Sequence, residues 1–226
     1  MWEHNKRSAR YTIRPLIKFE STYYWGPYAV RGAGIIWSGS PSAGTLPVDI
    51  GGPRIDELLE QWKQLLDVQV ELRAAEVVKR FTPHVTPSAK LHRLDRAGKH
   101  PEDLGDYDVL AYCPKAHAVL NIECKNMLPV FCMKDARRLR ETIFGVPGKD
   151  EGHFRQIEKR QQYLLGHWAA IAMALKWPLS AAEPPKILSL YVTPITYWWT
   201  RFPPRKVETI FLRVEMLSKF IQDLGA

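Results

Sequence analysis

The sequence predicts an α/β protein in which a mixed central sheet is flanked by long helices, and three features support this prediction. Residues 105–126 contain two short alternating runs that end in charged residues, which is typical of a β-hairpin. Apolar residues recur at helical spacing over residues 53–81 and 151–177, which indicates two long amphipathic helices. Residues 187–192 form a near-continuous apolar run, which is typical of a buried strand.

Residues 1–52 are predicted to form a β-rich extension of a main domain that spans residues 53–226. The aromatic and β-branched residues of the extension indicate a hairpin that turns at residues 20–21, then a third strand at residues 35–37 and a loop over residues 38–44. Three basic residues are interleaved with the aromatic ones: Arg14, Lys18 and Arg31. This mixture suits stacking on nucleic-acid bases, although packing of the aromatic side chains onto the main domain is the more ordinary explanation.

The first long helix is predicted to begin near Pro53 and to end before Pro83. Its expected buried stripe comprises Ile55, Leu58, Leu59, Trp62, Leu66, Val70, Ala74, Val77 and Phe81. The pattern blurs at residues 67–69, so one kinked helix and two separate helices are both open. Glu71 shares a side of the helix with small apolar residues and can approach the sheet, whereas Glu76 neighbours basic residues on a solvated face.

Further elements are predicted on either side of the hairpin. A first core strand is expected between residues 85 and 94, a short helix over residues 134–144, an edge strand over residues 207–212 and a closing helix over residues 214–224. The long helix over residues 151–177 carries a polar row at steps of three and four: His153, Gln156, Arg160, Tyr163 and His167. Such a row is unusual for a randomly solvated surface.

The register of the hairpin follows from the position of its turn. Residues that face each other in a two-stranded hairpin have numbers with a constant sum, and a turn centred on residues 115–116 gives a sum of 231. This register sets Asp108 opposite Glu123. It also sets Asp106 opposite Lys125, and all four side chains share one face because the period of a strand is two.

Two carboxylates that face each other across a strand pair repel, so they require a compensating charge. A divalent cation is the simplest candidate. The side chains of Asp108 and Glu123, with a backbone carbonyl such as that of Cys124, make an all-oxygen site that suits Mg²⁺ or Mn²⁺. Lys125 points to the same place, where it can hold or deprotonate a water molecule or offset a developing negative charge.

The sequence GDYDVLAY at residues 105–112, followed by NIECKN at residues 121–126, resembles the PD-(D/E)xK nuclease superfamily. In that superfamily a metal-binding Asp ends one strand and an ExK motif lies on the next. The resemblance covers roughly residues 71–165, and Cys124 stands where a small aliphatic residue is more usual. It implies a restriction-endonuclease-like αβββαβ core, Mg²⁺ or Mn²⁺ as the cofactor, and endo- or exonucleolytic hydrolysis of DNA.

The resemblance also implies roles for individual residues. It places Asp108, Glu123 and Lys125 at the catalytic centre, adds Glu71 as a metal-binding acid on the preceding helix, and places Gln156 near the metal. Basic residues expected to contact the nucleic-acid backbone are Lys159, Arg160, Arg137 and Arg138. Acidic residues lie among the basic residues of the segment before residue 152, so a mixed solvated face is the alternative there.

A structural explanation of the charged hairpin competes with the catalytic one. Asp106 and Lys125 could form an ordinary cross-strand ion pair while Asp108 and Glu123 are solvated at the edge of the sheet. Two alternative functions are also open. The chain could be a catalytically silent nuclease-fold module that binds nucleic acid or serves as a scaffold in a larger assembly, or an enzyme that acts on RNA or on a small phosphorylated substrate.

The net charge of the chain bears on its partners. The sequence has 32 Lys and Arg against 24 Asp and Glu among 226 residues, a net charge of +8 that fits nucleic acid or an acidic protein. Three cysteines without paired spacing indicate neither a disulfide framework nor a zinc site. No secretory signal and no apolar run long enough for a bilayer are recognised, so we expect a cytoplasmic protein without a membrane partner. A homodimer or a larger complex is left open.

Overall fold

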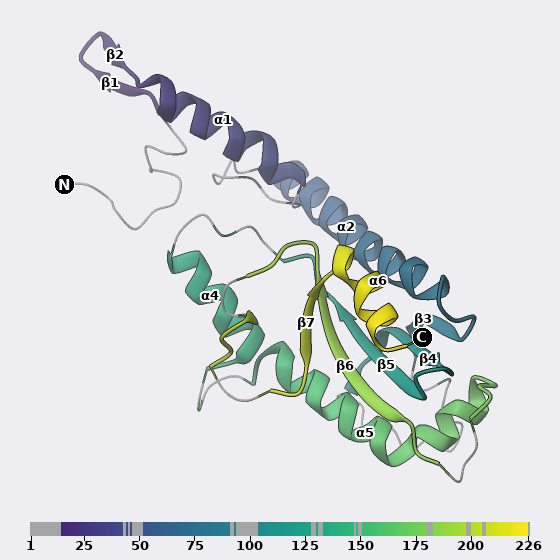
Figure 1. Ribbon diagram of the computed structural model, residues 1–226. Helices are drawn as coiled ribbons and strands as arrows, with labels where there is room; N and C mark the ends of the chain where they lie inside the picture. Colours follow the sequence, from purple (N-terminus) through teal and green to yellow (C-terminus); the bar gives the residue numbers. More distant parts are fainter. Residues whose placement is uncertain are drawn as a thin grey trace. The chain divides into compact units, whose positions relative to one another are not determined.

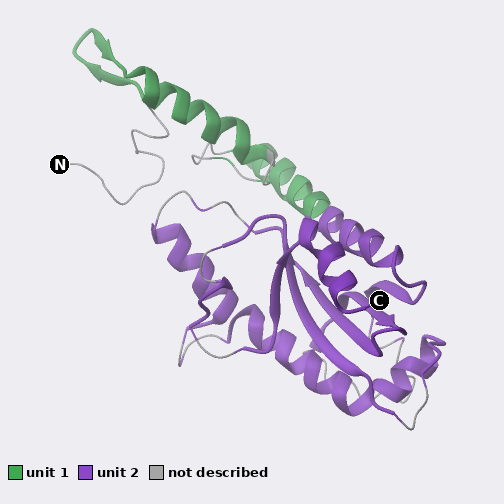
Figure 2. Cartoon of the chain, in the orientation of Figure 1, with its two compact units in different colours: residues 1–66 green, residues 67–226 purple. Residues whose placement is uncertain are grey.

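The computed structural model describes residues 15–42, 44, 46, 52–90, 93, 104–127, 130, 133–146, 148, 151–179, 183–197, 200–204 and 207–225. The chain divides into two compact units, which we call unit 1, residues 1–66, and unit 2, residues 67–226 (Figure 2). The boundary falls inside one long helix, α2, which spans Pro53–Lys79. The predicted division into domains at residue 52 stays a prediction.

The described part of unit 1 begins with a short antiparallel hairpin of β1, Ile17–Phe19, and β2, Thr22–Tyr24. Its turn at Glu20 and Ser21 is the predicted one, and Glu20 adopts a positive φ of 53° there. Residues 11–14, where the predicted hairpin begins, lie outside the described residues. The hairpin leads into helix α1, Pro27–Ser42.

The predicted third strand at residues 35–37 and the predicted loop at residues 38–44 are wrong, because most of these residues belong to helix α1. Pro27 suits the first helical position, where no backbone N–H is needed. The hydroxyl of Ser40 donates to the carbonyl of Ile36 at 2.7 Å, so this polar side chain is satisfied within the helix itself. The helix therefore accommodates residues whose individual preferences indicate a strand or a loop.

Helix α2 is continuous, so the break considered near residues 67–69 does not occur. Its two halves differ in burial. Val70 and Ala74 are buried as predicted, but Leu58 is 57% exposed and Trp62 43% exposed, so the predicted buried stripe is wrong for the first half. Among the described residues of unit 1, only Ala33, Ser40 and Gly44 are buried, so unit 1 does not provide an apolar core for that stripe.

Unit 2 contains a five-stranded mixed sheet in the order β3-β4-β5-β6-β7 (Figure 1). The strands are Val85–Ala89, Tyr107–Cys113, Ala118–Cys124, Lys186–Thr193 and Ile210–Arg213. The pairs β3–β4 and β4–β5 are antiparallel, whereas β5–β6 and β6–β7 are parallel. The predicted mixed sheet, with its apolar strand at residues 187–192 and its edge strand near residues 207–212, is confirmed.

Helices cover both faces of this sheet (Figure 1). The unit 2 part of α2 and helix α6, Val214–Asp223, pack on one face. Helix α5, Gly152–Ala174, packs on the other face, beside helix α4, Met133–Phe144. The predicted α/β architecture is therefore confirmed. None of the helices in the described part of the chain combines the length and the apolarity needed to cross a lipid bilayer.

Candidate active site

The hairpin β4–β5 has the predicted register. Val109 pairs with Ile122 and Cys113 with Ala118, and both pairs have the predicted sum of 231. The same register makes Asp108 and Glu123 the next opposed pair, at the end of the hairpin away from its turn. Leu110, two residues after Asp108, packs towards α5, so strand alternation directs both carboxylates to that face of the sheet.

A single ammonium group bridges the two carboxylates. The Nζ of Lys125 lies 2.7 Å from Oε1 of Glu123 and 3.5 Å from Oδ2 of Asp108. The backbone N–H of Cys124 also donates to Oδ2 of Asp108, at 2.7 Å. Asp106 is exposed, and Lys125 forms ion pairs with Asp108 and Glu123 instead of the cross-strand pair with Asp106 that the competing structural explanation requires. The predicted convergence of Asp108, Glu123 and Lys125 is therefore present.

Arg160 of helix α5 completes the surroundings of Glu123. Its guanidinium NH1 forms an ion pair with Oε2 of Glu123, and its Nε donates to the carbonyl of Leu104 at 2.7 Å. The residue is only 5% exposed. The predicted contact of Arg160 with a nucleic-acid phosphate is therefore wrong, because the guanidinium is buried and binds Glu123 and Leu104.

The sequence contained a signal for this burial. Arg160 lies three residues after Ile157 and four before Leu164, so it occupies a position on the apolar stripe of α5. A charged residue on a buried stripe requires an opposite charge within the fold, because an unpaired buried charge is very costly. Among the acids of the neighbouring strands, Glu123 supplies that charge.

Gln156 lies one turn before Arg160 on α5 and is bound to the same backbone segment. Its Nε2 donates to the carbonyl of Leu104 at 3.3 Å. Gly105 follows Leu104 with a φ of +62°, and a Cβ there would lie 2.9 Å from Nε2 of Gln156 and 3.1 Å from NH2 of Arg160. The positive φ favours glycine, and any larger residue would also have to displace the ends of the Gln156 and Arg160 side chains, which accounts for the first residue of the GDYD sequence.

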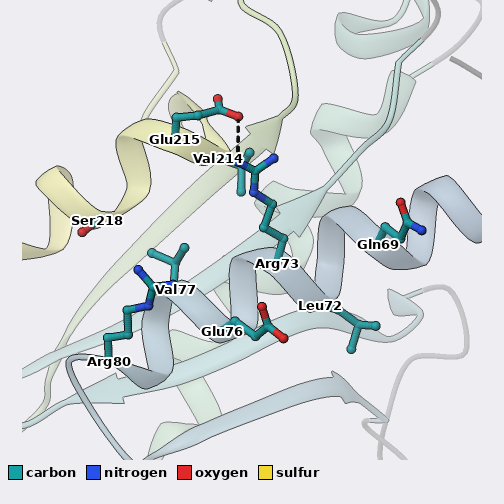
Figure 3. Close-up of a pocket in the computed structure, with 9 residues that line it drawn as sticks. All are labelled: Gln69, Leu72, Arg73, Glu76, Val77, Arg80, Val214, Glu215 and Ser218. Atoms are coloured by element: carbon teal, nitrogen blue, oxygen red, sulfur yellow. Dashed lines mark ion pairs between the residues drawn. The ribbon is translucent and has the colours of Figure 1, made fainter. Parts of the chain in front are cut away.

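Glu71 is the helix acid that the structure brings near this cluster. Burial raises the pKa of Glu71, and the negative charges of Asp108 and Glu123 raise it further, against an opposing effect of Lys125. Glu76 instead lines an open groove of about 540 Å³ between α2 and α6 (Figure 3). Other residues lining that groove include Arg73, Arg80 and Glu215, and Arg73 forms an ion pair with Glu215 at 3.3 Å.

The carboxylates and the lysine shift one another's proton affinity. Burial raises the pKa of Asp108 and the charge of Glu123 raises it further, while Lys125 and the N–H of Cys124 oppose these effects. Burial alone would lower the pKa of Lys125, but the carboxylates of Glu123 and Asp108 outweigh it, so the pKa is raised. Lys125 is therefore a stable cation at neutral pH.

The donor atoms of the cluster suit a hard divalent cation. Asp108, Glu123 and the carbonyl of Cys124 offer oxygen only, and the Lys125 ammonium shows that one cation can approach both carboxylates. In the part of the chain that the structure describes, no group of three or more His, Cys, Asp or Glu side chains is arranged to hold a metal ion. An ion here would complete its shell with backbone oxygen and water, as Mg²⁺ commonly does.

Comparisons of the chain with protein-family models, with curated proteins and with solved structures find no match. Any function assigned to the cluster therefore rests on its own geometry and chemistry.

The other predicted phosphate contacts lie on helices α4 and α5. Arg137 and Arg138 are exposed on α4, and Arg137 pairs with Glu141 one turn later at 2.7 Å. Lys159 on α5 lies 3.6 Å from Glu151. These ion pairs are largely exposed and contribute little to stability, so a phosphate could compete for the basic groups. Nucleic-acid binding by these residues stays a prediction.

Replacement of Gly105 by Ala is expected to lower the free energy of unfolding by about 1–3 kcal/mol. The new methyl group meets Gln156 and Arg160, and the backbone conformation is unfavourable for alanine. Gly166→Ala is the matched control, because Gly166 lies within helix α5 with open space around it and should gain about 0.4–1 kcal/mol. Urea denaturation measures both changes, and equal effects of the two substitutions would contradict this account.

Replacement of Asp108 by Asn is expected to stabilise the protein at neutral pH by roughly 0.5–2 kcal/mol, a common gain when a destabilising site group is removed. The pKa of Asp108 is raised in the folded protein, so the fold favours the protonated carboxyl. The stability that this preference contributes is fully present below the usual pKa of 3.8 and is lost as the pH rises through the folded-state pKa. Asn carries no charge and can still accept the N–H of Cys124. Urea denaturation at several pH values should show that the gain in free energy of unfolding of the variant over its parent grows from about pH 4 towards pH 7. A gain independent of pH would refute the assignment of the effect to the Asp108 charge.

Proposed function

We propose that the chain is a metal-dependent nuclease that hydrolyses DNA phosphodiester bonds. The observation that carries the proposal is the Lys125 ammonium bridging two carboxylates on adjacent strands, since the same place suits a divalent cation. The order of elements α2-β3-β4-β5-α5-β6 agrees with the αβββαβ core of the PD-(D/E)xK superfamily and supports a restriction-endonuclease-like fold, although α4 is inserted before α5.

The residues of the site divide the chemistry among them. Asp108, Glu123 and the carbonyl of Cys124 would hold Mg²⁺ or Mn²⁺, and Glu71 would complete the second coordination sphere or a second metal site. When bound, such an ion polarises the scissile phosphate and lowers the pKa of a water nucleophile. Lys125 orients that water or offsets negative charge in the transition state. Arg160 fixes the carboxylate of Glu123, and Gln156 fixes the segment that precedes β4.

The charge of the chain supports a nucleic-acid substrate. A net charge of +8 attracts a polyanion at long range. Helix α4 offers the basic groups of Arg137 and Arg138, and helix α5, on the same side of the sheet, offers the partly exposed Lys159. RNA stays an alternative substrate.

The test is an assay of cleavage of linear, nicked, single-stranded and supercoiled DNA with Mg²⁺ and with Mn²⁺. We expect Asp108→Ala and Lys125→Ala each to lower the cleavage rate by at least about 100-fold, the size of effect seen when a transition-state stabilising group is removed. Asp106→Ala is the matched control, because Asp106 is an exposed acid two residues from Asp108 and should be dispensable. Full activity in both site variants would overturn the proposal.

A specific observation favours a second function, that of a catalytically silent nucleic-acid-binding or scaffold module. Both oxygens of the Glu123 carboxylate are already engaged, one by Lys125 and the other by Arg160. The two positive groups balance the charges of Asp108 and Glu123 without a metal. DNA binding that survives EDTA and both site substitutions, with no cleavage under any of the conditions above, would support this second function.

A further inference from the structure

The hairpin and the start of helix α1 expose an unusual density of aromatic side chains. These are Phe19, Tyr23, Tyr24, Trp25 and Tyr28. Each exposes more than half of its surface, from 54% for Tyr24 to 87% for Tyr28. Aromatic side chains contribute much of the buried area of cores and interfaces, so a cluster of exposed ones marks a surface that binds something. We call these five residues the aromatic hairpin surface.

The register of the hairpin distributes these rings over two faces. Ile17 pairs with Tyr24 and Phe19 with Thr22, so Phe19 and Tyr24 share one face at diagonal positions. Lys18 pairs with Tyr23 on the opposite face, and its Nζ lies 5.7 Å from the centre of the Tyr23 ring. A flat partner could therefore stack on a ring while a negative group of the same partner meets a lysine.

The charge around this surface indicates the kind of partner. Residues 1–46 carry six Lys and Arg against two Asp and Glu. Among the described residues of that range, Lys18 and Arg31 are basic and Glu20 is acidic. Positive charge together with exposed rings matches a flexible polyanion whose bases have accessible faces, which is single-stranded nucleic acid. In a duplex the base faces are covered by their neighbours, so it offers these rings no stacking partner except at its ends.

We propose that the aromatic hairpin surface binds single-stranded nucleic acid, with bases stacked on its rings and phosphates near Lys18 and Arg31. That the strand is DNA, and that it is the strand to be cut, rests on the proposed nuclease function; the stacking itself does not. The surface would hold a single strand or a frayed duplex end independently of the metal. In this arrangement the aromatic hairpin surface selects single strands over duplex, and the carboxylate cluster carries out hydrolysis.

The test measures binding of the full chain to fluorescein-labelled oligothymidine of about 20 nucleotides, longer than the site of one typical single-strand-binding domain. Binding is followed by fluorescence anisotropy in EDTA, with the Lys125→Ala substitution present to prevent cleavage. A duplex of the same length is measured in parallel. We expect Phe19→Ala/Tyr23→Ala/Tyr24→Ala to weaken single-strand binding by at least about 30-fold, from the loss of two or more stacked bases, and to change duplex binding little.

The matched control removes exposed apolar surface from another element. Leu58→Ala/Leu65→Ala on helix α2 deletes two side chains of similar exposure and should leave single-strand binding unchanged. Lys18→Ala should reduce the dependence of binding on salt concentration, because one fewer counterion is released. Urea denaturation checks that the triple variant remains folded, which is expected because all three side chains are exposed.

Several results would overturn the proposal. One is a triple variant that binds oligothymidine as tightly as its parent, and another is an equal loss of binding in the leucine control. A parent chain that self-associates through these rings, or that binds anionic phosphatidylserine vesicles but not oligothymidine, would assign the surface to another partner. The two proposals can be refuted separately. Binding of oligothymidine that depends on the rings, without any cleavage, refutes only the nuclease function. Cleavage together with single-strand binding that the triple substitution does not change refutes only the role of the aromatic hairpin surface.

Discussion

Replacement of Arg160 by Met is expected to lower the free energy of unfolding by about 3–5 kcal/mol, the cost of breaking a buried ion pair by removing one partner. The guanidinium is bound to Oε2 of Glu123 and to the carbonyl of Leu104, and both of these acceptors would lose a donor. Glu123 is itself buried, so water cannot solvate its carboxylate in place of the lost guanidinium. Urea denaturation at neutral pH measures the change.

Two further variants separate the ion pair from general effects of losing an arginine. Arg137→Met removes an exposed arginine from helix α4 and should change the stability by no more than about 0.5 kcal/mol. Glu123→Gln in the Arg160→Met background removes a buried charge that has lost one of its two cationic partners and keeps only Lys125, and it should recover part of the loss. A double variant no more stable than Arg160→Met alone would show that the cost does not come from the charge of Glu123.

The geometry of the carboxylate cluster could be predicted from sequence because its determinants are local. A short turn fixes the register of a hairpin, and the register fixes which side chains face each other. Once the turn was placed at residues 115–116, the opposition of Asp108 and Glu123 followed by counting. The proximity of Lys125 then followed from the two-residue period of a strand.

The partners that come from distant parts of the chain could not be obtained in this way. Arg160 reaches Glu123 across 37 residues of sequence, and its burial depends on where helix α5 crosses the sheet. The pattern of α5 places Arg160 in a polar row with Gln156 and Tyr163, which favours a contact with a ligand and does not identify Glu123 as its partner. Periodicity predicts that a helix has faces; it does not state which strand each face meets.

The errors in unit 1 have a different cause. The apolar residues of α2 near Leu58 and Trp62 have helical spacing, and such spacing ordinarily indicates burial. In unit 1 few described residues are buried, so the pattern marks a face without a core beneath it. Helix α1 shows the complementary error, since the β-branched Ile35 and Ile36 are strand formers in isolation but lie in a helix. In α2 the periodicity predicted the helix correctly and only its burial was wrong, whereas in α1 the strand preference of the two isoleucines did not decide the local structure.

Replacement of Lys125 by Met is expected to have opposite effects on catalysis and on metal binding. The ammonium lies between the two carboxylates and competes with a metal ion for them, so its loss should tighten Mn²⁺ binding by about tenfold or more. Cleavage of DNA should nevertheless fall by at least about 100-fold, because the group that orients the water or offsets transition-state charge is gone. Isothermal titration calorimetry with Mn²⁺ and the cleavage assay measure the two effects in one preparation.

The same substitution should affect stability in a metal-dependent way. In EDTA the facing carboxylates of Asp108 and Glu123 lose a compensating charge, so the variant should unfold at a lower urea concentration than its parent. Saturating Mn²⁺ should restore the midpoint, because a bound ion stabilises the folded state in proportion to its affinity. Lys115→Met, at the exposed turn of the same hairpin, is the control and should change none of these quantities. Weaker Mn²⁺ binding in Lys125→Met would show that the lysine supports the ion instead of competing with it, and the charge balance inferred for the cluster would then be incorrect.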